Sequence, residues 1–196
     1  MAFAHCVYYH FWFSWAAFKP ETRVYSGAES PSAALETVPA STGIEPEADF
    51  QLDVYQGEDT LGGTPVAFSE VLDLGKPVVL NIWAGLCPIC RNEMPELQDA
   101  YETYGGEVVF VGVDVGPFVG LGSEEDALAL LDDLGITYPT GSTPDAKIIR
   151  DHKVLGTPAI YFITPGGHIV ERWNGFMTGN QLSKRIDELI DVSAGP

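Results

Sequence analysis

Residues 83–90 read Trp-Ala-Gly-Leu-Cys-Pro-Ile-Cys and form the most informative segment of the chain. The segment ends a strand-like apolar run, Pro77–Trp83, and precedes a helix-like run, Arg91–Tyr104. Cys87 and Cys90 are three positions apart, so they can close a small disulfide ring and reopen it. A helix N-terminus offers free N–H groups and a positive dipole, which favour a thiolate over a thiol. Because the thiolate is the species that attacks a disulfide, the segment indicates thiol–disulfide exchange.

A Cys-x-x-Cys pair has two other interpretations, namely half of a zinc site or two small core residues. A structural zinc site needs about four nitrogen or sulfur ligands, which requires a second Cys or His pair at suitable spacing. The third cysteine, Cys6, is far away in the sequence, and the four histidines form no such pair near it. The placement between a strand and a helix therefore favours redox chemistry.

The residues around the cysteines resemble the thioredoxin superfamily, and most of all its extracytoplasmic TlpA/ResA-type redoxins. Residues 78–84, the Cys pair and residues 91–97 carry the first part of this resemblance. A second signature lies far downstream, where residues 156–159 (Gly-Thr-Pro-Ala) precede the apolar run Ile160–Ile163. In the family this proline is cis and lies against the disulfide, and the backbone of the preceding residue pairs with a substrate peptide. The resemblance covers about residues 48–191.

The resemblance implies a mechanism and a set of site residues. Cys87 would attack a substrate disulfide, and Cys90 would resolve the resulting mixed disulfide. The residues expected to bind substrate are Trp83, Pro88, Ile89, Thr157 and Pro158. The expected partners are protein thiols and disulfides, with an upstream thiol reductase that restores the dithiol. Neither a metal ion nor an organic cofactor is implied. The TlpA/ResA group mostly reduces, so we expect a reductant of protein disulfides outside the cytoplasm, for example in cytochrome c maturation.

Three positions depart from the family pattern. The family usually has Trp directly before the first Cys, whereas this chain has Leu86. Asn81 stands where thioredoxin has a buried Asp that assists proton transfer, and an Asn cannot titrate, so water or another carboxylate must assist. The dipeptide between the cysteines is Pro-Ile and not the Gly-Pro of thioredoxin. Since no His, Lys or Glu lies between the cysteines, the helix terminus is the main visible stabiliser of the thiolate.

Several further residues have both a functional and a structural interpretation. Trp83 either shapes the active-site surface or belongs to the core. Glu93 either assists proton transfer or is a solvated residue of the first helical turn, and we expect the second. His152 and His168 are expected to be solvated. The loop of residues 116–122 carries apolar side chains among glycines, and it either contacts a partner or folds over the core.

Two other functions compete with disulfide exchange. A peroxiredoxin-like peroxidase shares the fold, but peroxiredoxins place their reactive Cys in a Pro-x-x-x-Thr/Ser-x-x-Cys setting. Residues 80–86, which precede Cys87, contain neither Pro nor Thr. The second competitor is a non-catalytic module that uses the fold only as a docking surface. The intact Cys pair and the Thr157-Pro158 signature count against it.

Composition and charge limit the class of protein. The chain has 196 residues, which suffices for one domain with a substantial core plus a tail. A hydrophobic content of 45% argues against general disorder. The formal net charge is −18, from 28 acidic and 10 basic residues. This balance opposes binding to nucleic acid or to an anionic lipid surface, because both require basic patches. It predicts a mild preference for basic partners.

The N-terminal segment, residues 1–20, is aromatic and apolar. Residues 1–18 contain no Asp, Glu, Lys or Arg, and their Trp, Tyr and Phe side chains suit a membrane interface. The length is at the lower edge for a spanning helix, and a clear basic n-region or cleavage site is missing. Three interpretations stay open: a membrane anchor or atypical signal, a mis-assigned start, or a soluble tail. Cys6 is expected to be a bystander or an acylation site.

Residues 21–47 are rich in Pro, Ser, Ala, Thr, Gly and Glu without apolar periodicity, which predicts a flexible linker. Anchor, linker and redoxin domain, here residues 48–196, is a familiar layout for the family in the periplasm or on the outer face of the cell membrane. A cytoplasmic thioredoxin would not need the linker, so the layout favours an extracytoplasmic protein attached to the membrane.

The pattern of the domain predicts an α/β protein with a thioredoxin-like fold. We expect a central mixed β-sheet flanked by helices, with an N-terminal β-hairpin extension that starts at residues 50–55 and turns at Gly62-Gly63. Near-continuous apolar runs predict central strands at 77–83 and 107–113. Further helices are expected over about 123–134 and 144–152, followed by a hairpin over 158–173 and a closing helix around 182–190.

Overall fold

The computed structural model describes residues 48–195. The sequence-based predictions for residues 1–20 and 21–47, including the membrane anchor, the linker and Cys6, lie outside this range. Within it, no helix combines the length and the apolar character that crossing a bilayer requires.

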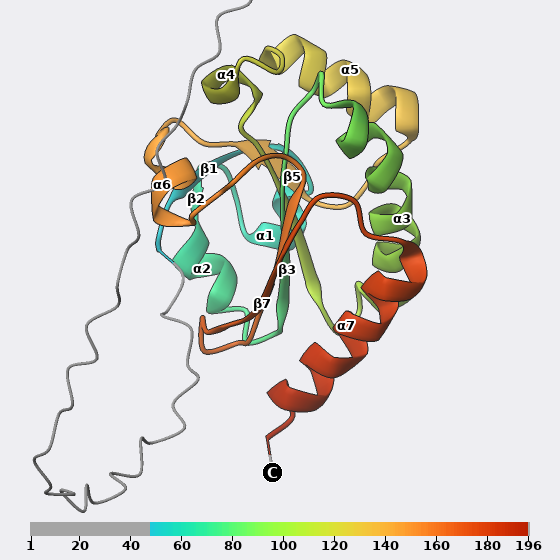
Figure 1. Cartoon of the computed structure of the whole chain (residues 1–196). Helices are drawn as coiled ribbons and strands as arrows, with labels where there is room; N and C mark the ends of the chain where they lie inside the picture. Colours follow the sequence, from blue (N-terminus) through green and yellow to red (C-terminus); the bar gives the residue numbers. More distant parts are fainter. Residues whose placement is uncertain (1–47, 196) are drawn as a thin grey trace, which may run out of the picture. The chain divides into compact units, whose positions relative to one another are not determined.

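The described residues form a seven-stranded mixed β-sheet with helices on both faces (Figure 1). The strand order is β2-β1-β5-β4-β3-β6-β7. The strands are β1 (Gln51–Gln56), β2 (Val66–Ala67), β3 (Val78–Trp83), β4 (Val109–Asp114), β5 (Thr140–Ser142), β6 (Ala159–Ile163) and β7 (Ile169–Asn174). The helices are α1 (Glu58–Leu61), α2 (Phe68–Leu72), α3 (Pro88–Tyr104), α4 (Gly116–Val119), α5 (Glu124–Leu134), α6 (Lys147–Asp151) and α7 (Gly179–Ser193).

Strand β3 is the central strand on which the site is built. All six of its residues are buried, as expected for a strand covered on both faces. It pairs in parallel with β4 and antiparallel with β6. The antiparallel register sets Ile82 opposite Ala159, so the C-terminal end of β3 lies beside the N-terminal end of β6.

Each face of the sheet carries its own apolar core. Alternate residues of β3 point to opposite faces, so Val79 and Trp83 belong to one core and Leu80 and Ile82 to the other. Helices α3, α5 and α7 cover the first face, and α1, α2 and α6 contribute to the second (Figure 1). Buried side chains of α3, including Cys90 and Met94, hold the start of that helix against the first core.

The predicted central mixed sheet with flanking helices is confirmed, and three details differ. The N-terminal hairpin exists as β1 and β2, but β1 also pairs antiparallel with β5 and so extends the main sheet. Strand β5 was not predicted, because three residues of sequence Thr-Gly-Ser give no apolar run. Helix α3 starts at Pro88 and not at Arg91. A proline is well tolerated there, because the first helical N–H has no partner within the helix.

The join between β1 and β5 generates a testable prediction at Gly141. A Cβ atom at this position would meet the backbone carbonyl oxygen of Asp53 on the neighbouring strand. We therefore expect Gly141→Ala to lower the free energy of unfolding by about 1–3 kcal/mol, because backbone must move to accept the methyl group. Gly106→Ala is the matched control, since nothing lies within 4 Å of its Cβ position. Urea denaturation measures both, and equal stabilities for the two variants would contradict the tight packing of β1 on β5.

Candidate active site

Cys87 and Cys90 form a disulfide at the start of α3. Cys87 is the N-cap residue of the helix, and its Sγ accepts a hydrogen bond of 3.1 Å from the backbone N–H of Cys90. Cys87 is 3% exposed and Cys90 is fully buried, so an incoming molecule can reach only the Cys87 side of the disulfide. An N–H that points at the sulfur stabilises negative charge there, which favours Cys87 as the thiolate of the reduced pair.

The second predicted signature lies directly beside the disulfide. The Thr157-Pro158 peptide bond is cis, as the family resemblance implied. Cys87 Sγ lies 3.6 Å from the carbonyl oxygen of Thr157. The carbonyl oxygen of Pro158 accepts a 2.9 Å hydrogen bond from Gly175 N–H, which ties this segment to the loop after β7. The pairing of Ile82 with Ala159 brings these two distant parts of the chain together.

The residues expected to bind substrate differ in how deeply they are buried and in where they lie relative to Cys87. Pro88 and Ile89 are exposed on the first turn of α3 beside Cys87. Thr157 is half-buried and Pro158 is buried, and both lie along the edge that faces the sulfur. Trp83 has no exposed surface and packs into the first core. The structure thus brings four of the five residues to the surface or edge of the site and places Trp83 in the core behind it.

Exposed apolar side chains occur in the segments around the disulfide. Leu86, which takes the place of the family's Trp, is 57% exposed, and its N–H donates a 2.7 Å hydrogen bond to Leu121 O. This bond joins the Cys87 loop to the loop of residues 116–122, where Phe118 is exposed and Leu121 packs on the core. The loop therefore packs partly on the core, while the expectation that it contacts a partner stays a prediction. Leu155 and Phe176 are also exposed, near Thr157 and Gly175 in sequence; these side chains suit contact with an apolar stretch of polypeptide.

The prediction that Glu93 is solvated is wrong. Its side chain is fully buried, and one carboxylate oxygen accepts a 2.7 Å hydrogen bond from the backbone N–H of Met177. Burial raises the pKa of Glu93 to about 7, although the Met177 bond lowers it in part. A signal for this burial was present in the sequence. Glu93 lies three positions after Cys90 and four before Leu97, so it falls on the same helical stripe as these buried residues.

Asn81 and Tyr138 form a buried polar pair on the same face of the sheet. The Asn81 side-chain amide donates a hydrogen bond of 3.3 Å to the hydroxyl of Tyr138. Burial raises the pKa of Tyr138, and the negative charge of Glu93 raises it further, so Tyr138 is a neutral phenol. Asn81 is therefore a fixed partner of Tyr138 and not a proton carrier. Glu93 is the group whose pKa suits proton transfer near neutral pH. Sequence reasoning missed Tyr138, which lies in the short segment between α5 and β5, where no pattern predicts an element.

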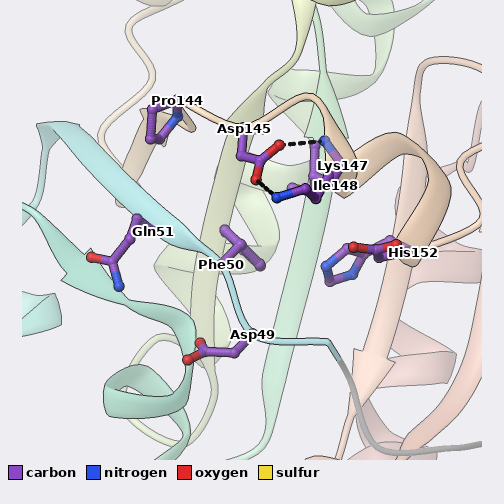
Figure 2. A pocket seen from close by; sticks show the side chains of 9 residues that line it. Asp49, Phe50, Gln51, Pro144, Asp145, Lys147, Ile148 and His152 are labelled. Carbon is purple, nitrogen blue, oxygen red and sulfur yellow. Dashed lines mark hydrogen bonds and ion pairs between the residues drawn. The ribbon is translucent and has the colours of Figure 1, made fainter.

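His152 also differs from its prediction, whereas His168 is exposed as expected. The His152 side chain is buried and its ring packs edge-on against Phe50 and Tyr161. It lines a pocket of about 400 Å³ between the start of β1 and α6, with Asp145 and Lys147 paired at the rim (Figure 2). None of the predicted site residues lines this pocket. Over residues 48–195, no group of three or more His, Cys, Asp or Glu is arranged to hold a metal ion.

Comparison with known proteins agrees with this geometry. The model of the AhpC/TSA family matches residues 45–172, which is more than half of the chain. The chain belongs to the AhpC/TSA family. Thiol-disulfide oxidoreductase ResA of Oceanobacillus iheyensis is 31% identical over 144 residues, covering 72% of this chain and 69% of that protein. Thiol:disulfide interchange protein DsbE of Escherichia coli is 32% identical over 125 residues, covering 62% of each.

A solved structure supports the fold in the same way. StoA from Bacillus subtilis superimposes with a TM-score of 0.57 at 19% identity, covering 70% of this chain and 95% of StoA. The chain has the predicted thioredoxin-like fold and is a thiol–disulfide oxidoreductase of the ResA and DsbE type, with a Cys87–Cys90 disulfide.

The raised pKa of Glu93 predicts a pH-dependent stability. The folded-state pKa of about 7 lies above the ordinary value of 4.5, so the folded protein holds this proton more tightly than the unfolded chain. Ionisation of Glu93 therefore lowers stability progressively as the pH rises from about 4.5 to 7. Glu93→Gln removes this ionisation, and we expect its stability relative to the wild type to increase by about 3 kcal/mol between pH 4.5 and 8.

Urea unfolding of the oxidised protein at the two pH values measures this difference. Glu107→Gln, on an exposed carboxylate, is the control and should show no comparable change between the two pH values. A Glu93→Gln variant with the same relative stability at both pH values would show that Glu93 does not titrate in this window.

Proposed function

We propose that this protein is a reductant of protein disulfides outside the cytoplasm, for example in cytochrome c maturation. One observation carries the proposal: the Cys90 N–H points at Cys87 Sγ, which itself lies 3.6 Å from the carbonyl oxygen that precedes cis-Pro158. This arrangement combines a stabilised nucleophile with the half-buried backbone of Thr157 beside it, where a substrate chain would lie. The resemblance to TlpA/ResA-type redoxins supports the extracytoplasmic location and attachment to the membrane through residues 1–18.

The reaction begins with the reduced protein. The Cys87 thiolate attacks one sulfur of a substrate disulfide, and a mixed disulfide between Cys87 and the substrate forms. The second substrate sulfur leaves as a thiolate and takes up a proton. The Cys90 N–H and the terminus of α3 stabilise the Cys87 thiolate before the attack.

The second step resolves the mixed disulfide. Cys90 loses its proton and attacks Cys87 Sγ, so the Cys87–Cys90 disulfide forms and the remaining substrate sulfur leaves as a thiolate. Glu93, one turn along α3 and with a pKa of about 7, is a suitable acceptor for the Cys90 proton. The substrate has then gained two electrons and two protons. An upstream dithiol reductase must return two electrons to restore the reduced protein.

The substrate chain would bind along the edge next to the sulfur. Thr157 offers its backbone beside Cys87, and Pro88 and Ile89 are exposed on the first turn of α3 next to the sulfur. The exposed Leu86 broadens this surface with an aliphatic side chain. A bound chain with apolar residues next to its cysteine would gain most from these contacts.

The charges near the cysteines support the reducing direction. A redox couple becomes more oxidising when its thiolate form is stabilised. Here Arg91, the cation next to Cys90, pairs with Asp133 at 3.2 Å, and Glu93 is a buried carboxyl in the next turn. A carboxylate disfavours a nearby thiolate. Within residues 48–195, the cation adjacent to the cysteines in sequence is thus already paired with a carboxylate, which favours a low reduction potential.

The order of the two cysteines can be tested by trapping. We expect Cys90→Ser to accumulate a mixed disulfide with a protein substrate such as oxidised insulin, because Cys87 can attack but nothing resolves the product. The matched control, Cys87→Ser, should form none. Non-reducing electrophoresis and mass spectrometry of the adduct measure both. Disulfide cleavage by the Cys87→Ser protein would contradict the mechanism, and peroxide consumption faster than insulin reduction by the wild type would favour a peroxidase.

The direction of electron flow follows from the reduction potential. Equilibration of the full chain in thiol redox buffers gives the potential of the Cys87–Cys90 couple. We expect a value near the thioredoxin end of the scale, roughly −270 mV, because Arg91, the cation next to Cys90, is paired with Asp133. A value near about −120 mV, typical of a strong oxidant, would recast the protein as a disulfide donor.

A further inference from the structure

A second buried carboxyl, Asp114, lies at the end of β4 behind the exchange site. Its side chain is 1% exposed, and in the sheet it stands opposite Trp83, the last residue of β3. One carboxylate oxygen accepts a 2.8 Å hydrogen bond from Gly116 N–H, and the other accepts one of 3.4 Å from the hydroxyl of Tyr55. The backbone N–H of Gly85 also acts on this carboxylate and lowers its pKa slightly. The mechanism above makes no use of Asp114.

The two backbone donors belong to the two loops that border the disulfide. Gly85 lies in the short loop between β3 and Cys87, and Gly116 begins α4 in the loop after β4. The loops also bond to each other through Leu86 N–H and the carbonyl oxygen of Leu121, at 2.7 Å. A Cβ on Gly85 would lie 2.6 Å from the backbone nitrogen of Ala127, so this loop is packed tightly against α5 as well.

We propose that Asp114 is the positioning residue of the Cys87 nucleophile, because its carboxylate holds the loop before Cys87 and the loop that starts α4 together. The inference rests on Cys87 as the attacking thiol of the proposed function. A hydrogen bond to an ionised acceptor is about twice as strong as one between neutral groups. Ionised Asp114 therefore fixes Gly85, two residues from the nucleophile, more firmly than a neutral side chain would.

The surroundings of Asp114 make this anchor sensitive to pH. Burial raises the pKa of Asp114 to about 6, while the bonds from Gly116, Tyr55 and Gly85 lower it in part. Glu124, from α5, is the charged group that acts on it, and it raises the pKa further. Tyr55, from β1, has a pKa raised to about 12 and is a neutral donor. Asp114 is half ionised at about pH 6, so the anchor strengthens as the pH rises through this value and weakens as it falls.

Three variants of the full-length reduced protein test the proposal. Asp114→Ala removes both acceptors, Asp114→Asn keeps one acceptor oxygen without the charge, and Tyr55→Phe removes only the long third bond. We expect insulin reduction to slow about tenfold in Asp114→Ala and about two- to threefold in Asp114→Asn, with Tyr55→Phe within twofold of the wild type. Amide hydrogen exchange at Gly85 and Gly116 should quicken at least tenfold in Asp114→Ala.

The pH profile separates positioning from a purely structural role. Between pH 5 and 8, the alkylation rate of Cys87 by iodoacetamide should carry an ionisation near pH 6 in the wild type. Asp114→Asn should lose it and shift the thiol pKa downward, because a neighbouring negative charge is gone. Glu93 and Cys87 titrate in both proteins, so the difference isolates Asp114.

Two results would overturn the proposal. One is an Asp114→Ala protein with wild-type exchange rate and wild-type protection of the Gly85 and Gly116 amides. The other is an Asp114→Asn protein that keeps the ionisation near pH 6, and this result decides the matter if Asp114→Ala does not fold. A wild-type protein that reduces no disulfide would instead refute the proposed function. The amide exchange of Gly85 and Gly116 would still test the anchor in that case.

Discussion

The antiparallel pairing of β3 with β6 is the constraint on which the site depends. Because Ile82 stands opposite Ala159, β3 ends where β6 begins, and the residues just outside the two strands meet. Cys87 follows β3 and Pro158 precedes β6, although 70 positions separate Cys87 from Thr157. A shift of this register by one residue would turn every side chain of β3 to the wrong face. The identity of both cores and the position of the disulfide are thus fixed by one strand pair.

The sequence predicts this arrangement because its decisive signals are local. The apolar run Pro77–Trp83, the Cys pair and the helix that follows are contiguous, and each has a pattern that identifies it without the rest of the chain. The Thr157-Pro158 signature likewise precedes a plain apolar strand, Ile160–Ile163. The local patterns do not show that the Cys pair and the Thr157-Pro158 segment meet across the sheet. The resemblance to a known family is what predicts this contact.

The structural features that the sequence did not predict depend on contacts with residues that are distant in sequence. Thr140–Ser142 becomes a strand only because β1 and β4 offer hydrogen-bonding edges on both sides, not because its residues favour one. The local sequence predicts that Glu93 is a surface acid, but in the fold its carboxylate lies against the loop at Met177 and accepts a hydrogen bond from the Met177 N–H. The sequence allows Trp83 to lie either at the active-site surface or in the core. It is buried because Gly112 beside it on β4 leaves room for the indole.

Asp114 and Glu93 are buried carboxyls on the same face of the sheet, and they differ in the hydrogen bonds that they accept. Asp114 accepts hydrogen bonds from Gly116 N–H and the Tyr55 hydroxyl, whereas Glu93 accepts one from Met177 N–H. Burial raises both pKa values, to about 6 and about 7, and the higher ordinary pKa of a Glu, 4.5 against 3.8 for an Asp, accounts for most of the difference. At neutral pH Asp114 is therefore largely ionised and suited to hold loops in place. Glu93, with a pKa of about 7, is about half protonated there and therefore has the pKa that the proposed proton exchange with Cys90 requires.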